Sequence, residues 1–260
     1  MDNVNKTLYI PLYGKSFVSR KGIILQDPKA EEIWEAEGFA LKGKSKSKWL
    51  AYYMGMRAAV FDRWVRRQMK LMPGAAVLHI GCGMDSRVLR IGTENCQWYD
   101  VDFPDVIAER EKYYQKTDRY QMLRADVRCC DFLSETVGRD AIVVMEGISM
   151  YLQSEELKQL LEGICTRFER VSLLMDCYTG FAAKASRYKN PINDVGVTQV
   201  YGIDDPRIIE TGGLVFLREH DMTPADMIDA LQGMEKAVYK RLYAGSIAKK
   251  MYRLYEYGKE

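Results

Sequence analysis

A glycine-rich turn flanked by acidic residues is the first feature that could do chemistry. The segment 79–87 reads His-Ile-Gly-Cys-Gly-Met-Asp-Ser-Arg and overlaps the end of an apolar run at 75–80. Gly81 and Gly83 permit a tight turn in which the backbone approaches a ligand closely. A Gly-x-Gly turn alone is a weak signal, and a loop without a ligand is the alternative. Its meaning therefore depends on the residues around it.

Asp102 is the second candidate. It ends the apolar run 96–102, 19 residues after Gly83, and an acid at the tip of the next strand can hydrogen-bond ribose hydroxyls. Asp100 lies two residues earlier on the same face of that strand. One of the two could simply cap the following turn. We favour Asp102 as the ligand-binding residue because it lies nearer the carboxyl end of the strand.

Two more acidic residues end apolar runs. Asp126 is the last residue of the run 121–126. At this position its carboxylate could accept from the exocyclic amine of adenine, or it could act as the N-cap of a helix. Glu146 closes 141–146, a run that is otherwise apolar. A buried carboxylate is costly there unless it is paired or faces a ligand cleft. Glu146 is therefore a candidate functional residue.

Asp85 distinguishes two cofactors. A dinucleotide-binding turn carries a third glycine and points a helix N-terminus at phosphate, whereas this chain has Met84-Asp85-Ser86-Arg87 there. A carboxylate would repel a pyrophosphate, but S-adenosylmethionine has no phosphate and carries an ammonium and a sulfonium group. The turn, including Asp85, therefore predicts a site for S-adenosylmethionine and its product S-adenosylhomocysteine. A nicotinamide-dinucleotide oxidoreductase is the alternative.

Arg57 is the remaining cofactor candidate. It lies in a predicted amphipathic helix, 48–71, four residues after Tyr53 and seven before Trp64, and so within the apolar stripe. In one alternative, the aliphatic part of the side chain is buried and the guanidinium extends to solvent. In the other, the guanidinium donates paired hydrogen bonds to a carboxylate. The methionine moiety of S-adenosylmethionine has such a carboxylate.

The elements that must position these residues follow from the hydrophobic periodicity. Helices are predicted first, and the chain then alternates between strands and helices. This alternation predicts a parallel, doubly wound α/β sheet, which places ligands at the carboxyl ends of its strands. We expect a helical cover over 1–72 and a cofactor-binding domain over 73–260. The predicted helices are 28–37, 48–71, 105–116, one capped by Ser154, and 224–250; the predicted strands are 75–80, 96–102, 121–126, 141–146, 171–177, 212–220 and a final antiparallel strand at 251–257.

Composition argues against several classes of protein. The net charge of +2 is too even for a dedicated nucleic-acid binder. Six cysteines without a CxxC pair, and two histidines, argue against a metal site. We see no export signal and no apolar run long enough to cross a bilayer, and so expect a cytoplasmic protein without a membrane partner. A basic run predicts either a solvated loop or a mobile cover for an anionic substrate, and comprises Lys42, Lys44, Lys46 and Lys48.

A series of short motifs runs along residues 20–260. They are Asp27-Pro28-x-Ala30, Arg57-x-x-x-Phe61-Asp62, Gly81-Cys-Gly83-Met-Asp85-Ser-Arg87, Tyr99-Asp-Val-Asp102-Phe-Pro104-x-Val106, Ala125-Asp126, Glu146-Gly147-x-x-Met150-Tyr151-Leu152 and Tyr201-Gly-x-Asp204-Asp205-Pro206. With these motifs the chain resembles the leucine carboxyl methyltransferase superfamily, and more closely its bacterial branch of tetracenomycin-pathway-type O-methyltransferases. The Asp-x-Asp-Phe-Pro and Glu-Gly-x-x-Met-Tyr-Leu motifs are specific in combination.

The resemblance implies both a fold and a set of roles. The fold is that of a class I methyltransferase: a Rossmann-like, seven-stranded, mostly parallel sheet with helices on both faces and an N-terminal helical cover. Arg57 would hold the carboxylate of S-adenosylmethionine, and Glu146 would lie near its amino group. The other implied contacts are those of Gly81 and Gly83 with methionine and ribose, Asp102 with the ribose hydroxyls, and Asp126 with adenine.

The implied reaction is an in-line displacement, in which an acceptor oxygen attacks the sulfonium methyl group. A carboxylate, with a pKa of about 4, needs no base at neutral pH, whereas a phenol or alcohol does. His79 is predicted to be a packed core residue and His220 a surface residue. The shortage of bases favours carboxyl methylation, with Glu146 and Tyr151 as candidate catalytic residues.

The acceptor is the least constrained part of the prediction. An insertion around 180–210 carries Phe181, Tyr188 and Tyr201, which suit a hydrophobic or aromatic small molecule but are also common in protein cores. The alternatives are the C-terminal carboxyl group of a protein as acceptor, and a non-catalytic protein that retains cofactor binding. The sequence does not indicate an oligomeric state.

Overall fold

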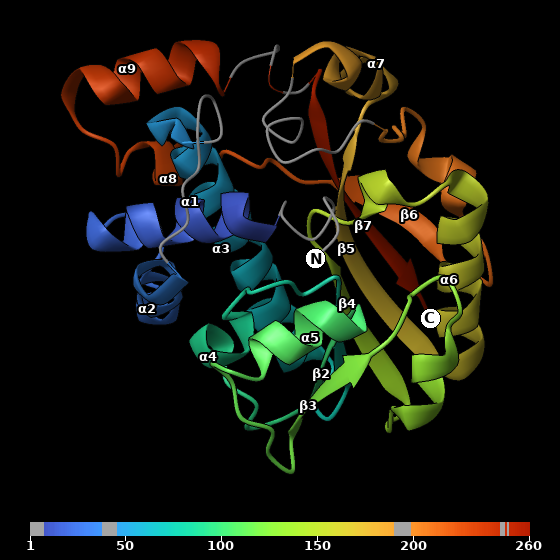
Figure 1. Cartoon of the computed structure of the whole chain (residues 1–260). Helices are drawn as coiled ribbons and strands as arrows, with labels where there is room; N and C mark the ends of the chain where they lie inside the picture. Colours follow the sequence, from blue (N-terminus) through green and yellow to red (C-terminus); the bar gives the residue numbers. More distant parts are fainter. Residues whose placement is uncertain (1–7, 38–45, 190–198, 245–247, 249) are drawn as a thin grey trace.

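A seven-stranded sheet forms the centre of the structure, a computed structural model (Figure 1). Its strand order is β3-β2-β1-β4-β5-β7-β6, and β7 alone runs antiparallel to its neighbours β5 and β6. The predicted seven-stranded, mostly parallel sheet is therefore confirmed. The strands are β1 Ala76–Ile80, β2 Gln97–Asp102, β3 Tyr120–Arg124, β4 Asp140–Met145, β5 Arg170–Tyr178, β6 Val215–Glu219 and β7 Tyr252–Lys259. The structure describes residues 8–37, 46–189, 199–244, 248 and 250–260, so Lys42 and Lys44 lie outside the described residues.

The helices cover both faces of this sheet. The predicted bounds of α2 and α3 are confirmed, with Pro28 in the first position of α2 and Pro73-Gly74 following α3. None of the described helices is long and apolar enough to cross a membrane. The helices are α1 Tyr9–Arg20, α2 Pro28–Glu37, α3 Lys48–Leu71, α4 Arg87–Ile91, α5 Pro104–Arg110, α6 Ser154–Arg167, α7 Gly180–Lys189, α8 Ala225–Ile228 and α9 Gly233–Leu242.

Two large apolar cores hold the layers together, and the described residues form a third, smaller one. All five residues of β1 are buried, as expected for a central parallel strand. Val77 belongs to the core shared with α3, whereas Leu78 and Ile80 belong to the core shared with α6. Because successive strand residues point to opposite faces, each strand except the largely exposed β6 contributes to both cores. The sheet therefore presents a rigid row of strand ends.

Helices from both ends of the chain cover the same side of the sheet. Figure 1 shows α1, α2 and α3 together with α8 and α9. The ring of Tyr239 in α9 contacts Tyr52 in α3 edge-on, with centroids 6.1 Å apart. Glu235 in α9 accepts hydrogen bonds from Lys48 at 2.7 Å and from the Tyr52 hydroxyl at 2.6 Å. The cover thus includes C-terminal helices as well as the predicted N-terminal ones.

The structure differs from the predicted helices at three places. The single helix predicted over 224–250 is divided into α8 and α9, because Gly233 has a φ of +52° at the first position of α9. The helix predicted over 105–116 ends at Arg110. The N-cap of α6 is Gln153 rather than Ser154, and it forms a reciprocal capping box with Glu156.

Candidate active site

A cavity of about 1080 Å³ lies between the described residues at the carboxyl ends of the strands, beneath α1, α3 and α9. All eight residues that the sequence assigned to cofactor binding or catalysis line this one cavity. These residues are Arg57, Gly81, Gly83, Asp85, Asp102, Asp126, Glu146 and Tyr151. The sheet therefore brings together side chains that are far apart in the sequence, as a doubly wound fold predicts.

The glycine turn after β1 is conformationally special. Gly81 and Gly83 have φ values of +67° and +51°, which favour glycine. The Gly81 amide donates to the carbonyl of Val101 at 2.8 Å, which holds the turn against β2. A Cβ atom at Gly81 would lie 2.6 Å from Cδ1 of Ile148. This position therefore needs glycine for both its φ and its space.

We expect Gly81→Ala to lower the free energy of unfolding by roughly 2–4 kcal/mol, from backbone strain plus the clash with Ile148, and to weaken S-adenosylmethionine binding. Gly74→Ala is the matched control, because Gly74 also has a positive φ, of +82°, but nothing lies within 4 Å of its Cβ position. That variant should lose about 1 kcal/mol. Thermal unfolding and calorimetric titration measure both effects, and equal losses in the two variants would contradict the argument.

The two acids of β2 have separate surroundings. Asp102 lines the cavity and accepts from the amides of Gly83 and Phe103, both at 2.8 Å. Asp100 is buried away from the cavity and accepts from the Tyr120 hydroxyl at 2.6 Å and from Arg110. Asp102, which the sequence favoured, is therefore the acid that faces a ligand, while Asp100 holds β2 to its neighbours.

Arg57 is buried and joins two carboxylates. Its Nε donates to Oε1 of Glu146 at 3.0 Å and its Nη1 donates to Oδ2 of Asp176 at 2.7 Å. The arginine thus presents a fork to carboxylates rather than reaching solvent. Burial alone would raise the pKa of Glu146, but Arg57 and Arg87 outweigh it and lower the pKa to about 2. Glu146 is therefore ionised and a weak base at neutral pH.

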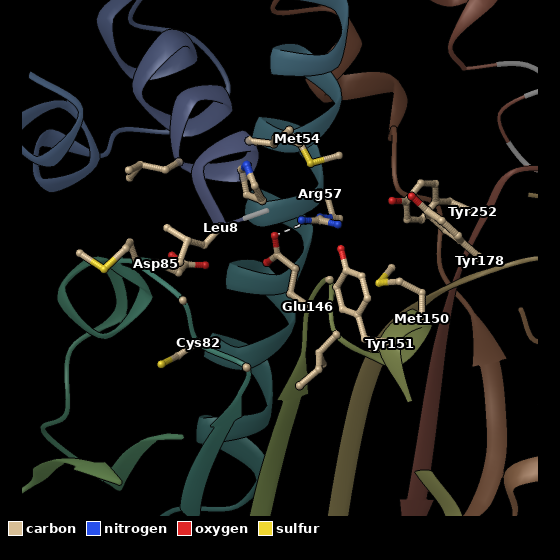
Figure 2. Close-up of a pocket in the computed structure, with 18 of the residues that line it drawn as sticks. Leu8, Met54, Arg57, Cys82, Asp85, Glu146, Met150, Tyr151, Tyr178 and Tyr252 are labelled. Carbon is tan, nitrogen blue, oxygen red and sulfur yellow. Dashed lines mark hydrogen bonds and ion pairs between the residues drawn. The ribbon is translucent and has the colours of Figure 1, made fainter. Parts of the chain in front are cut away.

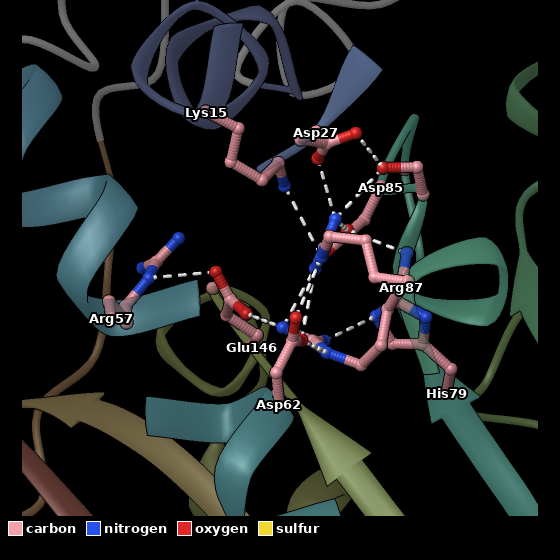
Figure 3. Close-up of polar contacts among 12 residues, drawn as sticks. Lys15, Asp27, Arg57, Asp62, His79, Asp85, Arg87 and Glu146 are labelled. Atoms are coloured by element: carbon pink, nitrogen blue, oxygen red, sulfur yellow. Dashed lines mark hydrogen bonds and ion pairs between the residues drawn. The ribbon is translucent and has the colours of Figure 1, made fainter. Parts of the chain in front are cut away.

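Asp85 is also paired, which changes one step of the cofactor argument. It forms ion pairs with Lys15 at 3.2 Å and with Arg90 at 2.9 Å (Figure 3). Burial would raise its pKa, but Arg87, Arg90 and Lys15 bring the pKa well below its usual range. The negative charge of Asp85 is therefore compensated within the protein, and Asp85 alone does not exclude a pyrophosphate.

Two further charged residues, Lys15 and Asp176, were not predicted from the sequence. Lys15 lines the cavity and is buried in α1, three residues from both Leu12 and Val18. Asp176 is buried in β5, in the apolar run that ends at Cys177. Both residues place a charge within an apolar pattern, which is the same signal that pointed to Arg57 and Glu146.

Asp126 and the histidines complete the set of predicted residues. Asp126 accepts from the amide of Arg128 at 3.1 Å and pairs with its side chain, and a turn follows rather than a helix, so the N-cap alternative is wrong. His79 is buried, as predicted, with Nδ1 3.1 Å from Asp100 and Nε2 3.2 Å from Arg87. His220 is half-buried against Glu256 rather than at the surface.

The opposite side of the cavity is aromatic. Figure 2 shows Tyr178 and Tyr252 side by side, with Met150 and Tyr151 between them and the charged group at Glu146. The rings of Tyr178 and Tyr252 meet edge-on, with centroids 4.5 Å apart. Every described lining residue after Gly147 is uncharged. The cavity therefore has a charged side and an uncharged aromatic side.

The predicted aromatic residues of the 180–210 insertion do not form this side. Phe181 is 63% exposed, and neither Phe181 nor Tyr201 is among the lining residues. The side chain of Tyr188 lies outside the described residues. The insertion instead contributes Ala185 and Ser186. The lining tyrosines come from other elements: Tyr53 from α3, Tyr151 from the segment after β4, Tyr178 from β5, Tyr243 from the end of α9 and Tyr252 from β7.

The chain is similar in sequence to known methyltransferases. Residues 3–165 match the family model described as leucine carboxyl methyltransferase. The chain is 29% identical over 244 residues to the tetracenomycin polyketide synthesis O-methyltransferase TcmP of Streptomyces glaucescens, covering 92% of this chain and 90% of that protein. It is 27% identical over 184 residues to the S-adenosyl-L-methionine-dependent methyltransferase dpfgK of Gibberella zeae. This match covers 65% of this chain and 62% of that protein.

The fold is also shared with a solved structure. The magnesium protoporphyrin IX methyltransferase ChlM of Synechocystis PCC 6803, crystallised with S-adenosylhomocysteine, superposes with a TM-score of 0.52 at 12% identity, covering 88% of this chain and 93% of that one. At this identity the likeness concerns the fold alone. Taken with the family match over more than half of the sequence, these findings decide against the oxidoreductase. The chain belongs to the leucine carboxyl methyltransferase family and is an S-adenosylmethionine-dependent methyltransferase.

Proposed function

We propose that this enzyme transfers the methyl group of S-adenosylmethionine to the carboxylate of a small molecule with an apolar body. The observation that carries the proposal is the division of the cavity into a charged side at the ends of β1 to β4 and an uncharged, aromatic side at β5 and β7. A zwitterionic nucleoside suits the first side, and an apolar acceptor suits the second. The helices over 1–72 would cover both.

The charged side fits the methyl donor. Arg57 uses Nε and Nη1 for its two carboxylates, and no described residue accepts from Nη2, which is left to bind the methionine carboxylate. Glu146 would accept from the methionine amine, Asp102 from the ribose hydroxyls and Asp126 from adenine. The backbone of Gly81 and Gly83 would pass along the methionine and ribose. When bound, S-adenosylmethionine supplies an activated methyl group on a sulfonium centre.

On the uncharged side of the cavity, no described lining residue carries a carboxylate or an imidazole that could act as a base for an alcohol or phenol. Glu146 has a pKa of about 2, and both ring nitrogens of His79 already have partners. Burial raises the pKa of Tyr53 and of Tyr252, so neither hydroxyl ionises readily. A carboxylate acceptor needs no deprotonation at neutral pH, and the residues then mainly align the reactants and exclude water.

We therefore expect aromatic carboxylic acids to be converted to methyl esters, with a kcat/KM that is level between pH 6 and 9, because the acceptor stays ionised throughout. Tyr151→Phe should keep activity within about tenfold, because the hydroxyl positions the acceptor and takes no proton. Product analysis distinguishes the outcomes, since base releases methanol from an ester and not from an aryl ether. Transfer to phenols alone, with a rate that rises tenfold per pH unit, would contradict the proposal.

Two further expectations accompany this proposal. A protein C-terminal carboxyl group is the alternative acceptor, and peptides in the same assay test it. A cytoplasmic location remains our expectation, supported by the six cysteines, all free among the described residues.

A further inference from the structure

The charged side of the cavity belongs to a larger buried network, which we call the buried charge cluster (Figure 3). It links α1, α2, α3, the turn after β1, α4 and the ends of β4 and β5. Each member is joined to another by an ion pair, and each side chain is 7% exposed or less. The members are the cations Lys15, Arg57, Arg87 and Arg90 and the carboxylates Asp27, Asp62, Asp85, Glu146 and Asp176.

The cluster holds one carboxylate more than it holds cations. The neighbouring pair of Asp100 and Arg110 is balanced and adds no net charge. Most carboxylates in the cluster each pair with more than one cation. Asp85, for example, pairs with Lys15, Arg87 and Arg90. Two carboxylates have a single cation: Asp27 pairs only with Arg90, and Asp176 pairs only with Arg57, which it shares with Glu146. Arg57 lines the cavity and Arg90 does not, so Asp176 is the singly paired carboxylate that lies next to the ligand site.

Asp176 is well placed to act through Arg57. Its Oδ2 accepts from Arg57 Nη1 at 2.7 Å, and its Oδ1 accepts from the amide of Gly147 at 2.6 Å. Arg57 and Gly147 both line the cavity, whereas Asp176 is fully buried behind them. Burial raises the pKa of Asp176, and Arg57 and the hydrogen bond from the Gly147 amide oppose this effect.

Methyl transfer changes the charge of the ligand. S-adenosylmethionine carries a carboxylate, an ammonium and a sulfonium, a net charge of +1. When the sulfur–methyl bond breaks and the acceptor carboxylate forms an ester, the sulfonium becomes a neutral thioether. S-adenosylhomocysteine therefore has a net charge of zero. A buried excess negative charge stabilises the first ligand more than the second, because electrostatic energies are large in poorly solvated sites.

We propose that Asp176 is a positioning residue whose excess charge favours binding of S-adenosylmethionine over S-adenosylhomocysteine. The net positive charge of S-adenosylmethionine neutralises the excess carboxylate of the cluster. S-adenosylhomocysteine has no net charge and does not neutralise it, which favours release of the product. The inference rests on the proposed placement of the methionine moiety at Arg57 and Glu146.

The test compares the dissociation constants of both ligands in Asp176→Asn, which keeps the shape and an acceptor oxygen but removes the charge. We expect S-adenosylmethionine to bind about tenfold more weakly and S-adenosylhomocysteine to change less than about twofold, so the ratio of the two constants shifts about tenfold. Asp27→Asn removes the same charge from the far end of the cluster and should shift the ratio by less than about threefold. Asp176→Glu restores the charge and should restore much of the ratio.

Several results would overturn the inference. If Asp176→Asn weakens the binding of both ligands equally, the ratio of the two constants is unchanged. Asp176 would then have a structural role only and no electrostatic role in selecting the ligand. If that variant does not fold, the wild-type protein is titrated with an analogue that carries an amine in place of the sulfonium methyl group. The analogue should bind several-fold more tightly than S-adenosylhomocysteine, and equal affinities would refute the inference. A wild-type protein that binds no S-adenosylmethionine would instead refute the proposed function.

Discussion

Replacing Arg57 by methionine is expected to reduce S-adenosylmethionine binding by at least about 100-fold and to lower the free energy of unfolding by roughly 3–5 kcal/mol. The affinity falls because the guanidinium is the proposed partner of the methionine carboxylate. The stability falls because Glu146 and Asp176 both depend on Arg57, and its loss leaves buried carboxylates without their counter-ion. Methionine keeps the length of the side chain, so the missing charge is the main change.

Two other variants separate these effects. Arg57→Lys keeps the charge but cannot donate to both carboxylates from a planar fork, so an intermediate loss of stability and a large loss of affinity are expected. Arg67→Met makes the same substitution at an exposed position of α3 and should change stability by less than about 0.5 kcal/mol. Calorimetric titration and denaturant unfolding measure both quantities. An Arg57→Met protein that binds the cofactor normally would refute the assigned role.

The neighbouring acids of β2 should respond to the same substitution in opposite ways. Asp100→Asn is expected to lower the free energy of unfolding by roughly 3–5 kcal/mol, because Arg110 then stays buried without its counter-ion. Asp102→Asn should change stability little, because an amide oxygen still accepts from Gly83 or Phe103. It should weaken cofactor binding by tenfold or more, because ribose hydroxyls lose a charged acceptor. Matching losses in the two variants would contradict this division.

The ionisation of Asp100 should make the free energy of unfolding depend on pH. Burial would raise the pKa of Asp100, but Arg110 and the hydrogen bond from His79 outweigh it and bring the pKa to about 2. The folded-state pKa is thus below the unfolded value of about 4, so the native state gains stability from ionised Asp100 above that value. This contribution, of about 2 kcal/mol, is lost as the pH falls from about 4 to about 2. Asp100→Asn should show a smaller loss of stability over that interval.

The sequence predicted most of the sheet and the location of the site because their signals are local. The apolar stripe that includes Tyr53 and Trp64 fixed the bounds of α3, and apolar runs ending in Asp102 and Glu146 marked two strand ends. Parallel strands then place these ends along one edge. No knowledge of side-chain contacts was needed for this step.

Contacts between distant segments were less accessible to sequence reasoning. Neither the pairing of Lys15 with Asp85 nor that of Arg57 with Asp176 follows from spacing, because the partners are 70 and 119 residues apart. The division between α8 and α9 depends on Gly233, whose positive φ a periodic pattern does not reveal. The sequence predicted an aromatic side made by Phe181, Tyr188 and Tyr201. The approach of Tyr252 to Tyr178 was not predicted, because it depends on the register of β7 against β5.

The position of β7 also imposes an order on folding during synthesis. The β6 segment emerges from the ribosome before β7 does, yet in the described sheet its only neighbouring strand is β7, which lies between β5 and β6. Residues 215–219 therefore have no strand to pair with until 252–259 have been translated and released from the exit tunnel. A nascent chain arrested before that point keeps an open edge at β5, and such edges invite pairing with other chains.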